Sequence, residues 1–310
     1  MHPGQPHQQR KRGFTLLEVL VASAILMLMV VLLASAIGTA LATVRRSNSK
    51  IDQFAATRAG FDSLTAILSQ ATLNTYWDYD NPTTPTNYIR KSDLHFLITN
   101  TTGDGGQSVF FQAPLARSGS TIPLGVLNAV GYWVEFGDDT WKPGHVIINR
   151  PRYRLIQGIQ PTESLAIFTN TTATWINGIK SIPTPAFPLA DNVIALILWP
   201  RRPTAQDSAG TELTADYTYD SRTGTDIQKA QLPPSVQVTM IVIDEASAIR
   251  ITSGNTEPAV IQNALKNRFR DVTQYQTDLD AVKSALTTAR INYLVLSSPV
   301  TLRESKWSQK

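Results

Sequence analysis

The chain has 310 residues, a formal net charge of +4 and no cysteine. This length can hold one or two domains with a buried core, and the lack of cysteine excludes disulfides and thiolate metal sites. Much of the positive charge lies at residues 10–12 and 45–50, at the two ends of an apolar segment, so the charge does not indicate a nucleic-acid-binding face.

The first 50 residues contain a long apolar segment between basic residues. Between Val19 and Val44 the sequence has no charged residue. A run of about 20 such residues is long enough to span a bilayer as a helix. Basic residues at positions 10–12 precede the run, and cations in this position stay on the cytoplasmic side. We therefore expect one transmembrane helix, a cytoplasmic N-terminus and an exported C-terminal part.

Glu18 is a carboxylate at the edge of this apolar segment. A charge inside the hydrocarbon costs about 2.5 kcal/mol or more, so such an acid usually has a partner and a function. A secretory signal peptide does not fit, because its apolar core is only about 7–15 residues long and its cleavage site follows that core. Here the processing-like junction, Gly13–Phe14, precedes the core. Cleavage there would leave the helix on the mature chain.

The sequence Gly-Phe-Thr-Leu-Leu-Glu at residues 13–18 resembles the N-terminal signal of type IV prepilins and type II secretion pseudopilins. The resemblance implies that a prepilin peptidase cleaves after Gly13 and that Phe14 becomes the N-methylated first residue. It also implies that Glu18 pairs with the N-terminal amine of a neighbouring subunit. An ammonium and a carboxylate lower each other's cost of burial when they are paired. The alternative is a plain single-pass anchor with a fortuitous Gly-Phe pair.

The helical pattern continues beyond the membrane segment. No proline occurs between Phe14 and Leu73, so the sequence predicts one helix of about 90 Å at 1.5 Å per residue. Its second part, residues 45–73, should be amphipathic and should lie with one apolar stripe against a sheet. The residues of this stripe recur every three or four positions: Ile51, Phe54, Phe61, Leu64, Ile67 or Leu68, and Ala71.

Residues 74–310 predict an α+β domain. The segment 74–87 contains Asn81, Pro82 and Pro85 and is typical of a loop. Short apolar or alternating runs between turn residues then predict an antiparallel sheet, with strands at 94–98, 109–111, 130–136, 146–148, 193–199 and 236–243. Gly103–Gly106 suits a hairpin loop between the first two strands, and residues 200–234 predict a long loop.

The C-terminal part predicts two helices and a last strand. The helices span 258–272 and 278–290, and the second places Leu279, Val282 and Leu286 on one face. The strand follows at 291–296. The Leu-Pro pair and alternating valines of residues 232–240 resemble the late strands of J-type minor pseudopilins. Residues 289–296 and 306–308 are similar to the C-terminal member, component C, of the pilin-like cassette proteins described in Verrucomicrobia.

The resemblance implies a pilin-like fold, in which a long N-terminal transmembrane helix packs on an antiparallel β-sheet, with extra C-terminal helices. The domain organisation expected from the sequence is a cytoplasmic prepilin leader, a transmembrane assembly helix, its amphipathic continuation and a periplasmic globular domain, at residues 1–13, 14–44, 45–73 and 74–310.

The sequence shows no constellation of catalytic residues. His95 and His145 lack metal-ligand spacing, and the acidic stretches 78–81 and 138–139 lack the spacing of a calcium loop. Asp244 and Glu245 are adjacent on a predicted strand and should point to opposite faces. The tryptophans are too dispersed for a nucleic-acid stacking platform. We therefore expect no enzyme activity and no cofactor. The sequence indicates no metal site and no nucleic-acid partner, and calcium binding at the two acidic stretches stays open as an alternative.

The sequence thus predicts a structural minor pilin or pseudopilin subunit in the bacterial inner membrane, able to enter a filament. The expected partners are prepilin peptidase, other pilin or pseudopilin subunits and the inner membrane. Three alternatives remain: a membrane-anchored periplasmic binding protein, an anchored enzyme and a DNA-binding competence pilin. An enzyme would need convergent titratable side chains in a cleft, and a competence pilin would need lysine and arginine clustered on one face.

Overall fold

The structure is a computed structural model that describes residues 15–101, 106–118, 126–138, 150–169, 174–180, 186–203 and 205–306. Contacts divide the chain into two compact units, Met1–Asp52 and Gln53–Lys310. Helix α1 (Leu16–Leu68) begins in the first unit and ends in the second. The long helix expected from the sequence is confirmed.

Helix α1 ends at Leu68 and does not continue to Leu73. The Ala71 N–H donates to the Leu68 carbonyl at 3.0 Å, which tightens the last turn. The next residue, Thr72, then donates its backbone N–H to the Gln112 carbonyl at 2.9 Å. Pairing with a strand therefore ends the helix, although its residues have no helix-breaking composition.

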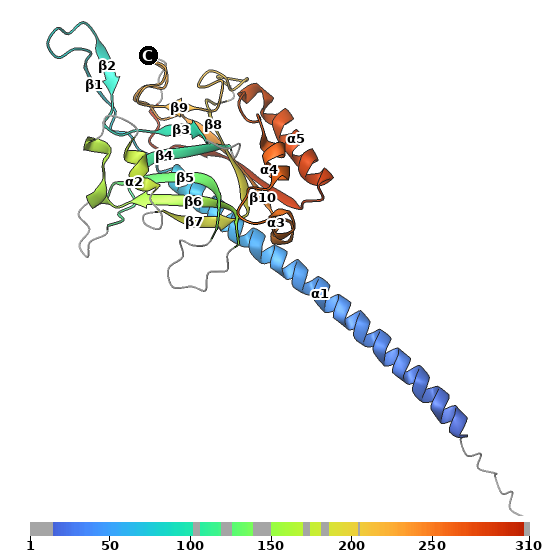
Figure 1. Cartoon of the computed structure of the whole chain (residues 1–310). Helices are drawn as coiled ribbons and strands as arrows, with labels where there is room; N and C mark the ends of the chain where they lie inside the picture. The colour runs from blue at the N-terminus through green and yellow to red at the C-terminus, as the bar shows by residue number, and fades with distance from the viewer. Residues whose placement is uncertain are drawn as a thin grey trace, which may run out of the picture. The chain divides into compact units, whose positions relative to one another are not determined.

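The second unit contains a six-stranded sheet with the order β7-β6-β5-β4-β3-β9, in which every neighbouring pair is antiparallel. Figure 1 shows it as the larger of the sheets. Its strands are β3 (Leu97–Asn100), β4 (Gln107–Ala113), β5 (Asn128–Gly137), β6 (Arg152–Gln160), β7 (Ala186–Asp191) and β9 (Tyr219–Asp220).

A three-stranded antiparallel sheet has the order β11-β10-β8. Its strands are β8 (Val193–Arg201), β10 (Ser235–Ile243) and β11 (Tyr293–Thr301). A separate hairpin pairs β1 (Tyr76–Tyr79) with β2 (Tyr88–Lys91). The short helices are η1 (Thr162–Ser164), η2 (Ile167–Thr169), α2 (Trp175–Ile179), α3 (Glu245–Ile251), α4 (Ala259–Leu265) and η3 (Val272–Gln274), and α5 (Tyr275–Thr288) is longer.

The α+β class and the antiparallel pairing expected from the sequence are confirmed. The loop predicted at 74–87 was wrong in part, because it contains β1. Residues 200–234 form a long connection between β8 and β10 that contains the short strand β9 and buried side chains, among them Leu213 and Tyr217. Strands β6 and β7 were not predicted. The strand expected at 146–148 lies outside the described residues.

The predicted hairpin between β3 and β4 is confirmed by the antiparallel pairing of Asn100 with Gln107. Gly106 has a φ of 92°, and a Cβ atom added to it would lie 2.1 Å from the Leu196 carbonyl oxygen. Only glycine fits this close approach of β4 to β8. The other glycines of this loop, 103 and 105, lie outside the described residues.

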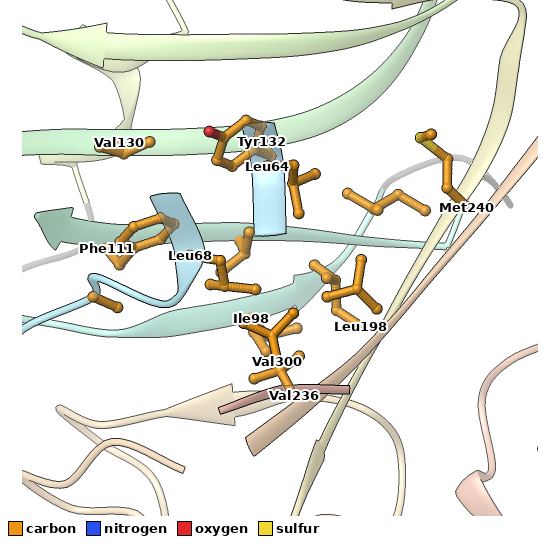
Figure 2. Packing of buried hydrophobic residues seen from close by; sticks show 14 of the residues in the cluster. Leu64, Leu68, Ile98, Phe111, Val130, Tyr132, Leu198, Val236, Met240 and Val300 are labelled. Carbon is orange, nitrogen blue, oxygen red and sulfur yellow. The ribbon is translucent and has the colours of Figure 1, made fainter. Parts of the chain in front are cut away.

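The main core of the second unit joins the end of α1 to both sheets. Figure 2 shows Leu64 and Leu68 among side chains of the six-stranded sheet, such as Phe111, and of the three-stranded sheet, such as Met240. Both leucines have 0% exposure. Burial of a leucine side chain stabilises the fold by about 1.5–3 kcal/mol. The expected apolar stripe therefore packs on sheets through Phe61, Leu64, Leu68 and Ala71.

Two further clusters cover the outer faces of the sheets. Helix α2 packs Trp175 and Ile179 onto the six-stranded sheet. Helices α3, α4 and α5 cover the three-stranded sheet, and in Figure 1 they gather beside β10. The face predicted for α5 is confirmed, because Leu279, Val282 and Leu286 are buried in this cluster.

Candidate functional site

Helix α1 begins with a reciprocal pair of side-chain caps. The Thr15 backbone N–H and hydroxyl donate to Glu18 Oε2 at 2.9 and 3.0 Å. In return, the Glu18 backbone N–H donates to Thr15 Oγ1 at 3.3 Å. This arrangement is a capping box, in which residues three positions apart satisfy the unpaired donors of the first turn. It fixes the Glu18 carboxylate at the start of the apolar helix.

Of the three site residues predicted from the sequence, the structure describes Glu18. Gly13 and Phe14 lie outside the described residues. The sequence analysis missed Thr15, which the structure brings together with Glu18. The signal was present, because Thr-x-x-Glu before an apolar run is the spacing of a capping box.

The surface of α1 after Glu18 is apolar on all sides. Every Leu, Ile, Val and Met of residues 16–41 is exposed in the isolated chain, including Leu16 at 84% and Leu32 at 61%. Within the described residues, this is one helix whose length and composition suffice to cross a membrane. An apolar surface of this extent requires lipid or neighbouring helices around it.

Two hydroxyl groups of this segment, those of Ser23 and Thr39, bond within the helix. The Ser23 hydroxyl donates to the Leu20 carbonyl at 2.9 Å, and the Thr39 hydroxyl donates to the Ser35 carbonyl at 3.0 Å. Polar groups in lipid must find partners inside the protein, because no water is present to bond them. These two side chains meet that requirement without a second helix.

The acidic side chains of the β1–β2 hairpin serve its own structure. Asp78 forms an ion pair with Lys91 at 2.8 Å. Asp80 Oδ1 accepts from the backbone N–H groups of Asn81, Thr86 and Asn87 at 2.8, 2.9 and 3.1 Å. The Thr86 hydroxyl, and after it these backbone donors, lower the pKa of Asp80. Asp80 therefore anchors the turn and Asp78 pairs with a lysine, so the two carboxylates do not converge on a metal-ion position.

Within the described residues, no group of three or more His, Asp or Glu side chains could hold a metal ion. His95 is buried, and burial lowers the pKa of its imidazole. Its ring centroid lies 6.3 Å from that of Trp175, so it belongs to the packing against α2. His145 lies outside the described residues.

Asp244 and Glu245 have separate partners. Asp244 accepts the Ser247 N–H at 2.9 Å and the Asn292 amide at 3.0 Å, and so caps α3. Glu245 accepts from Arg152 Nη1 at 3.1 Å and from the Asn192 amide. The two carboxylates do not converge on one substrate position.

A cavity of about 840 Å³ lies beside β3, β4, β5 and α4. Two of its carboxylates accept from neutral donors, Glu135 from the Trp133 indole at 3.0 Å and Glu257 from the Gln262 amide at 2.8 Å. Lys180 lies with its ammonium 5.2 Å from the Phe110 ring centroid, and burial lowers its pKa. The described lining offers no nucleophile hydrogen-bonded to a base.

Comparison with known protein families matches residues 8–34 to the model of the prokaryotic N-terminal methylation motif. The match includes Gly13, Phe14, Thr15 and Glu18, and it runs into the exposed apolar part of α1. No curated protein matches the chain. The motif points to a structural protein of the type IV pilin-like or pseudopilin kind, anchored in the membrane by one helix and processed by prepilin peptidase before it assembles with other subunits.

Proposed function

We propose that this protein, whose N-terminus carries the prepilin-type methylation motif, is a minor structural subunit of a type IV pilus-like or type II secretion filament. The observation that carries the proposal is the continuity of the motif with an exposed apolar helix whose first turn holds Glu18. The large α+β domain supports a minor position, because a domain of this size suits a site that is not repeated in every turn of a filament.

In this account the four segments have separate tasks. Residues 1–13 form the leader, residues 14–44 the transmembrane and assembly helix, residues 45–73 its continuation and residues 74–310 the exported domain. We assign the leader, with its cations at residues 10–12, to the cytoplasm and the domain to the periplasm.

Glu18 has two functions in this proposal: it caps α1, and it pairs with a neighbouring subunit during assembly. Both bonds from Thr15 end on Oε2, and we assign the other oxygen, Oε1, to the amine of Phe14 on a neighbouring subunit. The amine and the carboxylate are each costly in lipid and cost less as a pair. The capping box holds the carboxylate at a fixed depth, and this places every subunit in the same axial register.

Processing is tested by coexpressing the chain with a prepilin peptidase. The wild-type chain should lose residues 1–13 and become detectably smaller. Gly13→Ala should stay uncut, because the added methyl group obstructs the bond to be cleaved. Glu18→Val is the matched control, since it lies beyond the cleavage site and should be cut normally. An unchanged size of the wild-type chain would refute the processing step, and normal cutting of Gly13→Ala would refute the assignment of Gly13.

A further inference from the structure

The β1–β2 hairpin presents aromatic residues on one of its faces. In the antiparallel register Trp77 lies opposite Arg90, and Tyr79 lies opposite Tyr88. Residues two apart on a strand share a face, so these four side chains lie together. In Figure 1 the hairpin stands apart from the two larger sheets, and it forms a sheet of its own.

These aromatic side chains are unusually accessible. Trp77 is 58% exposed, Tyr79 42% and Tyr88 61%. The Tyr79 and Tyr88 ring centroids lie 4.4 Å apart, and the Arg90 guanidinium lies 6.0 Å from the Trp77 ring centroid. Tryptophan, tyrosine and arginine are the residues enriched at the energetic centres of protein–protein interfaces.

The hairpin is held in place by contacts at both ends. At its base, the Thr75 hydroxyl donates to the Ala230 carbonyl at 2.8 Å, and Arg90 Nη2 donates to the Asp226 carbonyl at 3.0 Å. At its tip, Asp80 accepts from the turn, and along the strands Asp78 pairs with Lys91. An isolated two-stranded hairpin is only marginally stable. These contacts therefore preorganise the aromatic face, which lowers the entropy cost of binding.

A cavity of about 340 Å³ opens beside this face, and Trp77 and Arg90 line it. Leu73 and Leu232 contribute apolar lining. The charged side chains of the described lining are the cations Arg90 and Lys306 and one carboxylate, Glu304. The site therefore combines a recess of mixed polar and apolar lining, large enough for one side chain, with one more cation than carboxylate.

We propose that the aromatic face of the hairpin, together with this cavity, docks a different protein that inserts an apolar side chain and places a carboxylate against Arg90. Charge complementarity selects this occupant over a second copy of the chain. In a two-fold symmetric dimer the same surface would meet itself, so two patches that each carry more cations than carboxylates would face one another. This interaction does not depend on the filament role, because the surface belongs to the second unit alone.

The test places a photo-crosslinking phenylalanine analogue at Tyr88 in the full-length chain, expressed in its native cells. The same analogue at Ile249, which is 58% exposed on α3, is the matched control. The expected product joins position 88 to one identified protein, at a site next to an Asp or Glu, and is absent from the control. Arg90→Glu should lower this product about tenfold or more, and Arg90→Lys should retain most of it.

The most decisive part of the test exchanges the charges of Arg90 and the partner's carboxylate. Changing the mapped carboxylate of the partner to lysine should restore the product with Arg90→Glu. Unchanged thermal unfolding of Arg90→Glu must accompany the result, and Tyr88→Ser, which leaves Arg90 in place, provides a second variant that should weaken coimmunoprecipitation of the same partner. A product between two copies of the chain, equal products at 88 and 249, no product, or no rescue by charge exchange would overturn the proposal.

Discussion

Thr15 and Glu18 cap the start of α1, and Glu18 also places a carboxylate at the edge of the apolar segment. A carboxylate at the third helical position satisfies backbone N–H groups of the first turn, and the same carboxylate is costly in lipid. The hydrogen bonds from Thr15 hold the carboxylate at the first turn of α1, so the cost of placing it in lipid arises there. We propose that the amine that processing creates on Phe14 further stabilises the Glu18 carboxylate in lipid.

Replacement of Glu18 separates insertion from assembly. Glu18→Val should insert into the membrane and be processed, and it should be lost from sheared filament fractions, because no carboxylate remains to pair with the amine. Thr15→Ser, which keeps a capping hydroxyl, should assemble normally. Thr15→Val should assemble less well than wild type but better than Glu18→Val. If Glu18→Val were incorporated at the wild-type level, the pairing function would be wrong.

Asp80 gives the hairpin a pH dependence of known sign. The hydrogen bonds from residues 81, 86 and 87 lower the folded pKa below the unfolded value of about 3.9. The stabilisation is therefore complete above about pH 4 and is lost as the pH falls through the folded pKa. The indole N–H resonance of Trp77 should hold its position down to about pH 4 and shift below it. Asp80→Asn should remove that shift; a shift that persists in this variant would exclude Asp80 as its cause.

At the scale of elements, the sequence analysis succeeded where the pattern is local. Strand β10 has alternating valines and α5 has an apolar face, and both were predicted. Strand β6 was not, because Arg154 interrupts its pattern. That side chain is buried, and its guanidinium donates to the carbonyls of Gly137 and Asp138 at 2.7 and 3.1 Å. The partners that allow this charge to be buried lie elsewhere in the sequence, so the local pattern of apolar residues does not reveal the strand.

The long loop at 200–234 was predicted, but the burial of its aromatic side chains was not, for a related reason. It has few aliphatic residues, and its order depends on contacts far along the chain. Tyr217 and Tyr219 are buried, and the Tyr219 hydroxyl donates to the Gln231 carbonyl at 3.1 Å. The candidate site was different, because the motif around Glu18 is contiguous. The bond from Thr15 to Glu18 could have been predicted from their spacing, whereas the aromatic face of the hairpin required the register of β1 and β2.

The last turns of α1 are part of the main hydrophobic core of the second unit. Leu64→Ala should lower the free energy of unfolding of this unit by about 2–5 kcal/mol, because it leaves a cavity between the two sheets. Chemical denaturation of the full-length chain measures this change. Ile249→Ala, at an exposed position, should change it by less than about 0.5 kcal/mol. Similar values for the two variants would show that α1 does not contribute to the core.

At the scale of the whole molecule, the two units differ in how their apolar side chains are covered. Residues 16–41 present an apolar surface that only lipid or other helices can cover, whereas the described part of residues 53–310 buries three hydrophobic clusters of its own. A membrane anchor alone would explain the first of these properties. The methylation motif and the capped carboxylate are the features that favour assembly over simple anchoring.

Processing should turn this helix into the assembly helix of a filament subunit. Mass spectrometry of the N-terminus of the protein, purified from its native membranes, measures this step. We expect a chain that begins at Phe14 and carries a methyl group on its amine. A chain that still begins at Met1, or one whose first residue lies beyond Glu18, would show that the helix is not processed in this way.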